Sequence, residues 1–230
     1  MATSGTTDFD LDIEELITEA YERCGIETRT GYDLRTARRS LNLLFAEWAS
    51  RGLNLWTIEQ HEQVLTAGQY EYDIPTNIVD ALSAVIRSPQ TGVVGSQYFD
   101  VTLNRFSQAE WLHTPNKAGT QGRPAQFYFQ RTIQPKAFFF PCPDDATTYT
   151  FVYYGIRRIE DAGAYTNTAD VNFRFLPCLA SGLAFFISLK KAPDRTLMLK
   201  QLYEEDWARI ANADVDRASY YAVPDVRGNV

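Results

Sequence analysis

The chain offers few residue patterns that could support catalysis. Its two histidines, His61 and His113, stand in different predicted elements, without a nucleophile or a second metal ligand at a suitable spacing. The three cysteines are far apart, which argues against a disulfide framework and a cysteine-based zinc site. Asp144 and Asp145 follow a proline, where aspartates usually bond to the backbone of their own turn. Because the glycine-rich loops that hold nucleotide phosphates are also missing, we expect neither a catalytic site nor a cofactor.

Four acids near the N-terminus have the spacing of a calcium-binding loop. Asp8, Asp10, Asp12 and Glu19 fall at positions 1, 3, 5 and 12 of that template. Position 6 is Ile13, whereas the loop needs glycine there for its turn, and an apolar helical pattern already begins at this residue. Acids are favoured at a helix N-terminus by the helix dipole, and this is our interpretation of these residues. The sequence therefore predicts no metal site.

The formal charge of −7 is concentrated at the N-terminus. Residues 1–28 hold eight acids and one base, so the rest of the chain is neutral. An acidic chain is not expected to bind nucleic acids in general, since that requires a basic footprint. Arg35, Arg38 and Arg39 form a basic face on the next predicted helix and could pair with these acids, within the chain or in a neighbouring copy. Exposed ion pairs contribute only about 0–1 kcal/mol each, so such pairs would orient a contact rather than stabilise the fold.

The composition indicates a globular protein. A chain of 230 residues with 45% hydrophobic content can form one large domain or two small ones. The acidic N-terminus does not resemble a signal peptide. The longest apolar run, Leu179–Leu189, contains serine and glycine and is too short to span a bilayer. We therefore expect no membrane anchor, and the cysteine usage favours a reducing compartment.

Apolar spacing predicts two helices near the N-terminus, joined by a short loop. Asp10 or Asp12 can cap the start of the first helix, and Gly25 stands where a left-handed residue commonly ends one. In the second helix, Asp33 is the expected N-cap and Gly52 follows the last turn.

Two more helices are predicted near the C-terminus. After about Val171 comes a segment that is apolar on most faces, which indicates a central, buried helix that stops at Pro193. Asp194 can cap the last helix. Residues 219–230 show no periodicity and are expected to form an extended tail.

The region between the helix pairs is typical of β-structure. Its strands are predicted near residues 79–87, 98–104, 125–132, 136–140 and 148–159, which are rich in tyrosine, phenylalanine, valine and threonine. The pair Ala67-Gly68 separates two alternating segments and predicts a β-hairpin. Ser107 and Glu110 have the spacing of a capping box on a short helix.

These elements predict an α+β fold in which a β-rich domain is inserted into a helical domain. Each helix pair is too short to bury its apolar stripe alone, so both pairs should form one bundle. The predicted parts are a flexible N-terminus at 1–8, a discontinuous helical bundle at 9–54 and 171–218, an antiparallel β-domain at 55–170, and a C-terminal tail at 219–230.

Several strings, taken in order, carry a resemblance that spans nearly the whole chain. They are Leu44–Gly52 running into Leu55–Thr57, Leu65–Tyr70, Gly122–Pro124 before Phe127–Phe129, Pro141 and Pro143 before Tyr153–Tyr154, and Leu179–Ala184. Their order and spacing resemble the head-to-tail adaptor family of tailed bacteriophages, the neck connectors called tail tubular protein A in short-tailed phages.

The resemblance implies a structural protein of the virion and not an enzyme. Members of that family assemble as a twelve-copy ring under the portal protein, extend the DNA channel and offer a docking platform to the next tail component, a nozzle or tail tube. Genomic DNA would pass through the channel during ejection without specific binding. The expected location is the head-to-tail neck, after assembly in the host cytoplasm.

The resemblance also implies roles for particular residues. The C-terminal tail would grip the portal, with Tyr220, Tyr221, Pro224 and Arg227 as the expected contacts. In a ring, the face formed by Glu15, Glu19 and Glu22 would either line the DNA channel or meet Arg35, Arg38 and Arg39 of a neighbouring copy.

Two alternative functions come from other features of the sequence. The aromatic-rich β-region could serve a carbohydrate- or receptor-binding module of the virion, although aromatics that alternate within strands favour a core. A hydrolase using Asp144 and Asp145 is the other alternative, and no motif supports it.

Overall fold

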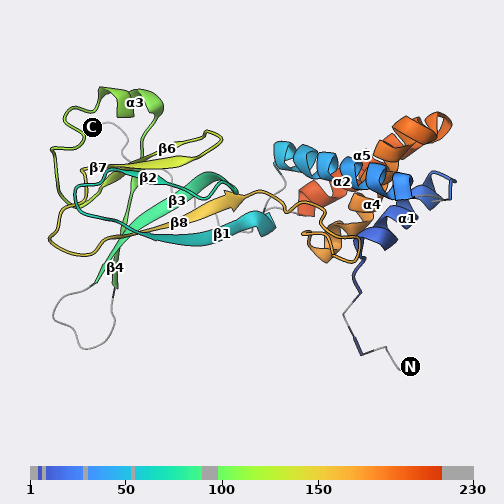
Figure 1. The fold of residues 1–230 in the computed structure, drawn as a ribbon, viewed down its shortest axis with the longest axis horizontal. Helices are drawn as coiled ribbons and strands as arrows, with labels where there is room; N and C mark the ends of the chain where they lie inside the picture. Colours follow the sequence, from blue (N-terminus) through green and yellow to red (C-terminus); the bar gives the residue numbers. More distant parts are fainter. Residues whose placement is uncertain (1–4, 7–8, 28–30, 53–54, 90–97, 214–230) are drawn as a thin grey trace, which may run out of the picture. The chain divides into compact units, whose positions relative to one another are not determined.

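The computed structural model describes residues 5–6, 9–27, 31–52, 55–89 and 98–213 (Figure 1). The chain divides into two compact units, a helical unit of residues 1–55 and 161–230 and a β unit of residues 56–160. The predicted α+β class is confirmed, since helices and mainly antiparallel sheets are both present. The expected tail at 219–230 lies outside the described residues.

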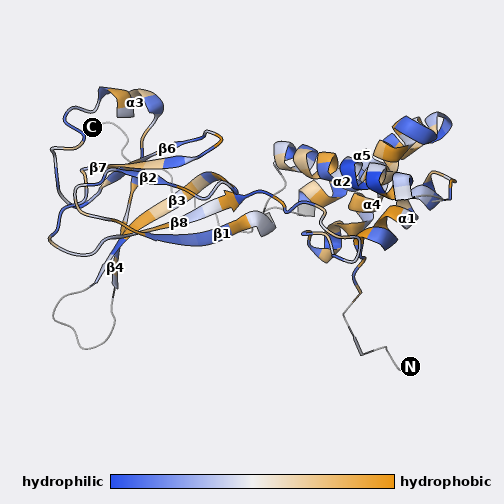
Figure 2. Ribbon diagram, in the orientation of Figure 1, coloured by the Kyte–Doolittle hydropathy of each residue, from blue (hydrophilic) through white to orange (hydrophobic). Residues whose placement is uncertain are grey.

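Four helices make up most of the helical unit. They are α1 (Ile13–Arg23), α2 (Gly31–Arg51), α4 (Leu176–Lys191) and α5 (Thr196–Ala213), with the short 3-10 turns η2 (Phe173–Phe175) and η3 (Pro193–Arg195). Helix α4 packs against α1, α2 and α5. Figure 2 shows its hydrophobic colouring, which agrees with the prediction of a helix that is apolar on most faces.

Together with η2, helix α4 is longer than the apolar run in the sequence suggested. Phe173–Lys191 forms one helical segment of 19 residues that is long and apolar enough to cross a membrane, with 61% of it buried inside the protein. This segment extends beyond the apolar run Leu179–Leu189 at both ends. Three packed helices account for the apolar character of α4, because a helix surrounded by protein needs no polar face.

Both ends of α1 follow the predicted capping chemistry. The Asp12 carboxylate accepts a hydrogen bond of 2.7 Å from the Glu15 backbone N–H. Gly25 has φ +71°, and its N–H donates to the Glu22 carbonyl, while the Ile26 N–H donates to the Tyr21 carbonyl. This pair of bonds is a Schellman motif, which satisfies carbonyls that the helix leaves unpaired.

Two predicted caps are wrong. Helix α2 already begins at Gly31, so Asp33 lies in its first turn, where it is buried and pairs with Lys191 of α4. A buried carboxylate needs such a cation, and this pairing takes the place of the expected capping role. Asp194 lies in η3, and α5 begins two residues later, at Thr196.

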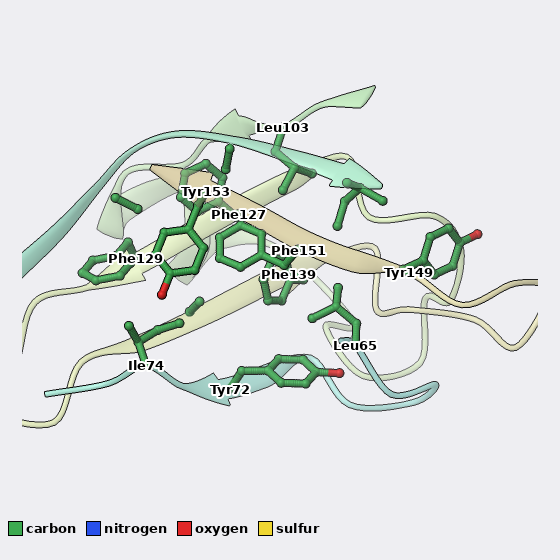
Figure 3. Packing of buried hydrophobic residues seen from close by; sticks show 14 of the residues in the cluster. Leu65, Tyr72, Ile74, Leu103, Phe127, Phe129, Phe139, Tyr149, Phe151 and Tyr153 are labelled. Atoms are coloured by element: carbon green, nitrogen blue, oxygen red, sulfur yellow. The ribbon is translucent and has the colours of Figure 1, made fainter. Parts of the chain in front are cut away.

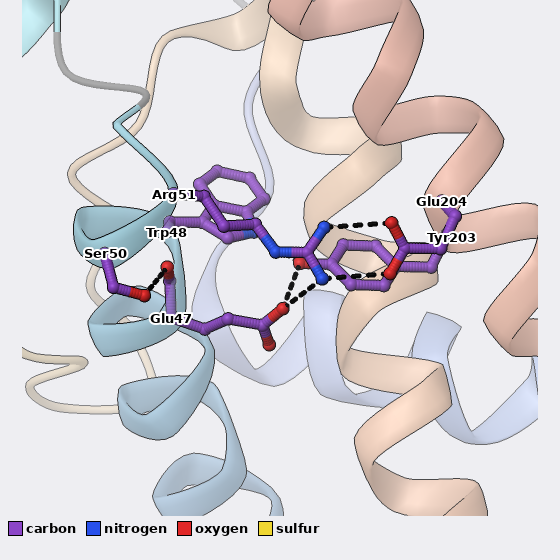
Figure 4. Close-up of polar contacts among 6 residues, drawn as sticks. All are labelled: Glu47, Trp48, Ser50, Arg51, Tyr203 and Glu204. Carbon is purple, nitrogen blue, oxygen red and sulfur yellow. Dashed lines mark hydrogen bonds and ion pairs between the residues drawn. The ribbon is translucent and has the colours of Figure 1, made fainter.

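A polar cluster joins α2 to α5 (Figure 4). Arg51 donates two hydrogen bonds to the Glu204 carboxylate, at 3.0 and 2.9 Å, and also pairs with Glu47. Its guanidinium lies 5.2 Å from the Tyr203 ring centre and 4.9 Å from that of Trp207. The hydrogen bonds from Arg51 hold the pKa of Glu204 below its usual value, so the carboxylate stays charged at neutral pH.

The helical unit includes residues 161–170, which were expected in the β-domain. The Ile13 and Glu14 N–H groups donate to the carbonyls of Asn167 and Tyr165, at 2.9 and 3.1 Å. The Ala162 N–H donates to the Asn42 side chain at 2.8 Å. These bonds fix the segment to α1 and α2 and use backbone donors that the first turn of α1 leaves unpaired. The boundary therefore falls at residue 160 and not at 170.

The β unit contains two four-stranded sheets, ordered β1-β8-β3-β4 and β2-β7-β6-β5. The strands are β1 (Ile58–Val64), β2 (Glu71–Asp73), β3 (Ile78–Pro89), β4 (Tyr98–Thr102), β5 (Asn104–Arg105), β6 (Gln126–Gln130), β7 (Lys136–Phe140) and β8 (Thr150–Arg157). The unit also contains the short helix α3 (Gln108–His113). The 3-10 turn η1 (Leu55–Thr57) belongs to this unit from Trp56 onward. Neighbouring strands are antiparallel except for the short β5–β6 pair, which is parallel. The capping box on α3 is confirmed, with bonds in both directions between Ser107 and Glu110.

The predicted hairpin around Ala67-Gly68 is wrong. Strand β1 pairs along its whole length with β8, whereas β2 pairs with β7 of the other sheet. The turn exists, with φ +76° at Gly68, but it carries the chain between sheets. The Tyr72 hydroxyl accepts a hydrogen bond from the Thr66 N–H and donates one to the Thr66 carbonyl. The Gly68 N–H donates to the Pro143 carbonyl. These contacts fix the turn in place between β1 of one sheet and β2 of the other.

An aromatic core lies between the two sheets (Figure 3). Phe151 of β8 meets Phe139 of β7 at a ring-centre distance of 4.8 Å and Phe127 of β6 at 5.8 Å. These three side chains are at most 2% exposed. Alternating aromatics therefore form the core of this unit, as their positions in the strands predicted.

The left-handed glycines that end α1 and α2 give a first prediction. Gly52 has φ +84°, and there is open space where a methyl group would be added. We therefore expect Gly52→Ala to lower the free energy of unfolding by about 1–2 kcal/mol through backbone strain alone. Gly25→Ala should cost about 2–3 kcal/mol, because its methyl group would also displace the Arg195 guanidinium, which lies 2.5 Å from the added carbon and donates to the Arg23 carbonyl. Urea unfolding of each variant measures the difference. Gly31→Ala, in ordinary helical conformation with free space, is the control and should change stability by less than about 1 kcal/mol.

The polar cluster around Arg51 gives a second prediction. Arg51→Ala should lower the free energy of unfolding by about 2 kcal/mol, since a partly exposed ion pair adds about 0–1 kcal/mol and each cation–π contact about 0.5–2 kcal/mol. Arg51→Lys should recover only part of this loss, because an ammonium group cannot form the paired bonds to Glu204. Thermal or denaturant unfolding provides the measurement. If Arg51→Ala were as stable as the exposed control Arg35→Ala, the cluster would not hold α2 to α5.

Candidate assembly surface

An open groove runs along the outer side of α1, next to η2 and the start of α4. Its volume is about 1190 Å³. Fifteen residues line it: Phe9, Asp10, Leu11, Asp12, Glu14, Glu15, Thr18, Glu19, Glu22, Arg23, Phe173, Arg174, Leu176, Pro177 and Ala180. We call this the α1 groove. It lies entirely within the helical unit, and the periodicity of α1 explains it, because the apolar stripe faces the core and leaves the acids outside.

The α1 groove is both acidic and apolar. Its lining includes six carboxylates and only two guanidinium groups, those of Arg23 and Arg174. Arg23 pairs with Glu19 at 2.8 Å, whereas Glu15 and Glu22 are exposed. Two phenyl rings are also open to solvent, Phe9 at 74% and Phe173 at 69% exposure. Exposed apolar side chains next to charges are typical of a surface that contacts another molecule.

The three arginines of α2 differ in their contacts. Arg38 donates to the Gly163 carbonyl at 3.1 Å and lies over the Tyr165 ring at 5.3 Å, so it holds the 161–170 segment. Arg35 and Arg39 are exposed. In the described part of the chain, no ion pair joins any of the three to the acids of α1. The expected pairing within the chain is therefore not observed.

Arg35 and Arg39 share their side of α2 with two exposed apolar residues. Tyr32 is 64% exposed and Leu43 is 55% exposed. The positions 32, 35, 39 and 43 are spaced by three or four residues and thus lie along one side of the helix. We call Tyr32, Arg35, Arg39 and Leu43 the α2 face. It carries two positive charges.

The sequence had not pointed to the apolar parts of these surfaces. Phe9 and Phe173 stand outside the periodic helical segments, and Tyr32 and Leu43 lie off the apolar stripe of α2. A large apolar residue on the polar side of an otherwise regular helix is the signal that could have identified Tyr32 and Leu43.

The residues considered for catalysis or metal binding lie in separate parts of the chain. His61 stacks on Tyr153 at a ring-centre distance of 5.4 Å, and His113 lies exposed in the last turn of α3. Asp144 accepts a hydrogen bond of 3.1 Å from the Ala146 N–H, which is the turn contact expected for it. Asp8 lies outside the described residues. Over the described ranges, no group of three histidine, cysteine or acidic side chains is placed to hold a metal ion.

Three aromatics outside the β core, Trp111, Tyr128 and Phe138, pack against one another. Trp111 of α3 lies 5.2 Å from the Phe138 ring centre and 6.2 Å from that of Tyr128, with Lys117 on its face at 5.2 Å. These rings are buried or half-buried by their mutual contacts. They attach α3 to its sheet, so they do not favour the alternative of a carbohydrate-binding platform.

The portal contacts expected at Tyr220, Tyr221, Pro224 and Arg227 lie outside the described residues. Their role stays a prediction.

Comparison with protein families gives a match over nearly the whole chain. A family described as the SU10 adaptor protein matches residues 11–228, a range that includes the whole β unit and most of the helical unit. The chain matches none of the curated proteins.

The exposed acids of the α1 groove give a third prediction. We expect Glu15→Gln combined with Glu22→Gln to change the free energy of unfolding by no more than about 0.5 kcal/mol, because both side chains are exposed. Asp12→Ala is the contrasting variant. It should cost about 1 kcal/mol, since it removes the N-cap of α1. Thermal unfolding of both variants tests the distinction, and a large loss in the double variant would show that these acids stabilise the fold itself.

Proposed function

The chain belongs to the SU10 adaptor family, and from this premise we propose that it forms a ring below the portal in the neck of a phage virion. The family consists of structural phage adaptors, which are virion components and not a class of enzymes. The observation that carries the proposal is the extent of the match, residues 11–228, which covers most of both units. The proposal therefore concerns the chain as a whole.

In this proposal twelve copies extend the DNA channel and present a platform to the next tail component, a nozzle or tail tube. The charge distribution supports passage of DNA without specific binding, because the formal charge of −7 lies in the first 28 residues and would repel phosphate wherever it faces the channel. Glu15, Glu19 and Glu22 therefore face either the channel or a neighbouring copy.

The portal would be contacted by residues 219–230, through Tyr220, Tyr221, Pro224 and Arg227. This range follows α5, which ends at Ala213, in the sequence. Segments that order on binding commonly lack a helical or strand pattern of their own, as this one does. Assembly would take place in the host cytoplasm. The free, buried thiols of Cys24, Cys142 and Cys178 suit a reducing compartment.

Electron microscopy of virions tests the proposal and its fourth prediction. We expect averaged images of virions that contain a tagged copy of the chain to show the tag at the neck. A chain that ends at residue 218 should fold normally but be lost from the neck, because it lacks the portal-contacting arm. Circular dichroism and quantification of the chain in purified virions provide the two readouts.

A chain without residues 1–4 is the matched control, since it also loses a terminus but keeps the arm. Density for the tag away from the neck would contradict the adaptor role. Full incorporation of the chain that ends at residue 218 would contradict only the role of the arm.

A further inference from the structure

We infer that the α1 groove of one copy receives the α2 face of the next copy. This inference rests on the proposed function, because it names the contact from which the ring is built. The two surfaces differ, so the contact is head-to-tail, and repetition of such a contact produces a closed ring when the rotation allows it.

The lining of the α1 groove defines the kind of partner it can hold. Exposed phenyl rings of Phe9 and Phe173 favour apolar or aromatic side chains, and they would lose their contact with water on binding. The carboxylates of Glu15 and Glu22 favour cations next to those side chains. A partner that combines apolar groups with positive charges on one helix side meets both requirements.

The α2 face has this combination. Tyr32 and Leu43 supply the apolar groups, and Arg35 and Arg39 lie between them. A second cation, Lys190, lies near Arg39. Burial lowers the pKa of Lys190, and the positive charge of Arg39 lowers it further. The stretch from residue 32 to 43 is about 16 Å long, which is about the length of α1. The two surfaces are therefore similar in length and opposite in sign of charge.

Among the described residues, the charges of the two surfaces do not neutralise each other within one copy. Glu19 and Arg35 make contacts within their own helices, since Glu19 pairs with Arg23 and Arg35 donates to the Gly31 carbonyl at 3.3 Å. None of the described ion pairs joins the α1 groove to the α2 face within one chain. Opposite charges on one compact unit that do not meet each other are suited to meet between copies.

The identity of the partner also follows from charge. DNA would be repelled by the carboxylates of the groove. A second copy offers an already ordered helix side of the right character, so it binds without the cost of ordering a segment.

Charge reversal of each surface tests the inference and is the fifth prediction. Variant A carries Glu15→Arg and Glu22→Arg, and variant B carries Arg35→Glu and Arg39→Glu, both in the full chain. Each variant alone should associate at least about tenfold more weakly than the unmodified chain, because like charges would meet at every contact. An equimolar mixture should recover association, since each reversed surface then meets a partner of opposite charge. Sedimentation velocity over a concentration series, in low and high salt, measures this.

Two controls separate the surfaces from general effects. Asp145→Arg with Asp194→Arg makes the same change in net charge as variant A, but at exposed acids outside both surfaces. This control should leave association unchanged. Phe173→Ser should weaken association, whereas Leu112→Ser, which replaces an exposed apolar residue of the β unit, should not.

The possible results decide the question in each case. Variants that associate like the unmodified chain, a mixture that fails to recover, or an unmodified chain that does not self-associate would each overturn the inference. Binding of the groove to portal protein or to residues 219–230 in place of a second copy would overturn it as well. In all these cases the neck location of the tagged chain could still hold, so the adaptor role would survive. Recovery by the mixture together with density away from the neck would instead reject the adaptor role alone.

Discussion

The helical unit depends on the burial of α4 by helices from both ends of the chain. Helix α4 has ten buried residues and packs against α1, α2 and α5, so no helix pair that is consecutive in sequence can cover it. Close approach is part of this arrangement. A methyl group at Gly182 would lie 2.9 Å from Tyr203 of α5 and 3.0 Å from Leu44 of α2, so only glycine lets the three helices meet there. Pairs such as Asp33 with Lys191, and Ser181 with Asp206 at 2.9 Å, then fix how the helices align.

This constraint determines which surfaces are left for other molecules. Since the apolar stripe of α1 is used by α4, its opposite side is free to be acidic, and charge there has little effect on the core. The same holds for α2, whose buried positions contact the unit while Tyr32 and Leu43 remain outside. Large apolar side chains are not needed on an exposed helix side for folding. Their presence beside charges suits these surfaces to contacts between molecules.

Local chemistry made the helix ends predictable, and long-range pairing made other features unpredictable. Asp12 and Gly25 could be identified because capping depends on neighbours within a few residues. Asp33 could not, because an aspartate near a helix start can either cap the helix or be buried, and the choice depends on Lys191, far along the chain. The turn at Gly68 has the same glycine signal whether its strands pair or separate, and only the long β8 strand decides between these outcomes. The α1 groove could not be predicted from the sequence for a similar reason, since Phe9 and Phe173 line one groove only through the packing of α1 on α4.

A contact made of exposed ion pairs and a few apolar side chains would be weak between two copies, and in the proposed ring this weakness has a use. Each pair contributes about 0–1 kcal/mol, so single contacts between free chains would break readily. Closure changes the balance, because the last contact of a ring is intramolecular and has a high effective concentration. A portal that holds the C-terminal arms of several copies would raise that concentration further. Chains with this surface would thus associate in solution only as their concentration rises, whereas a portal that gathers them would favour ring closure at the head.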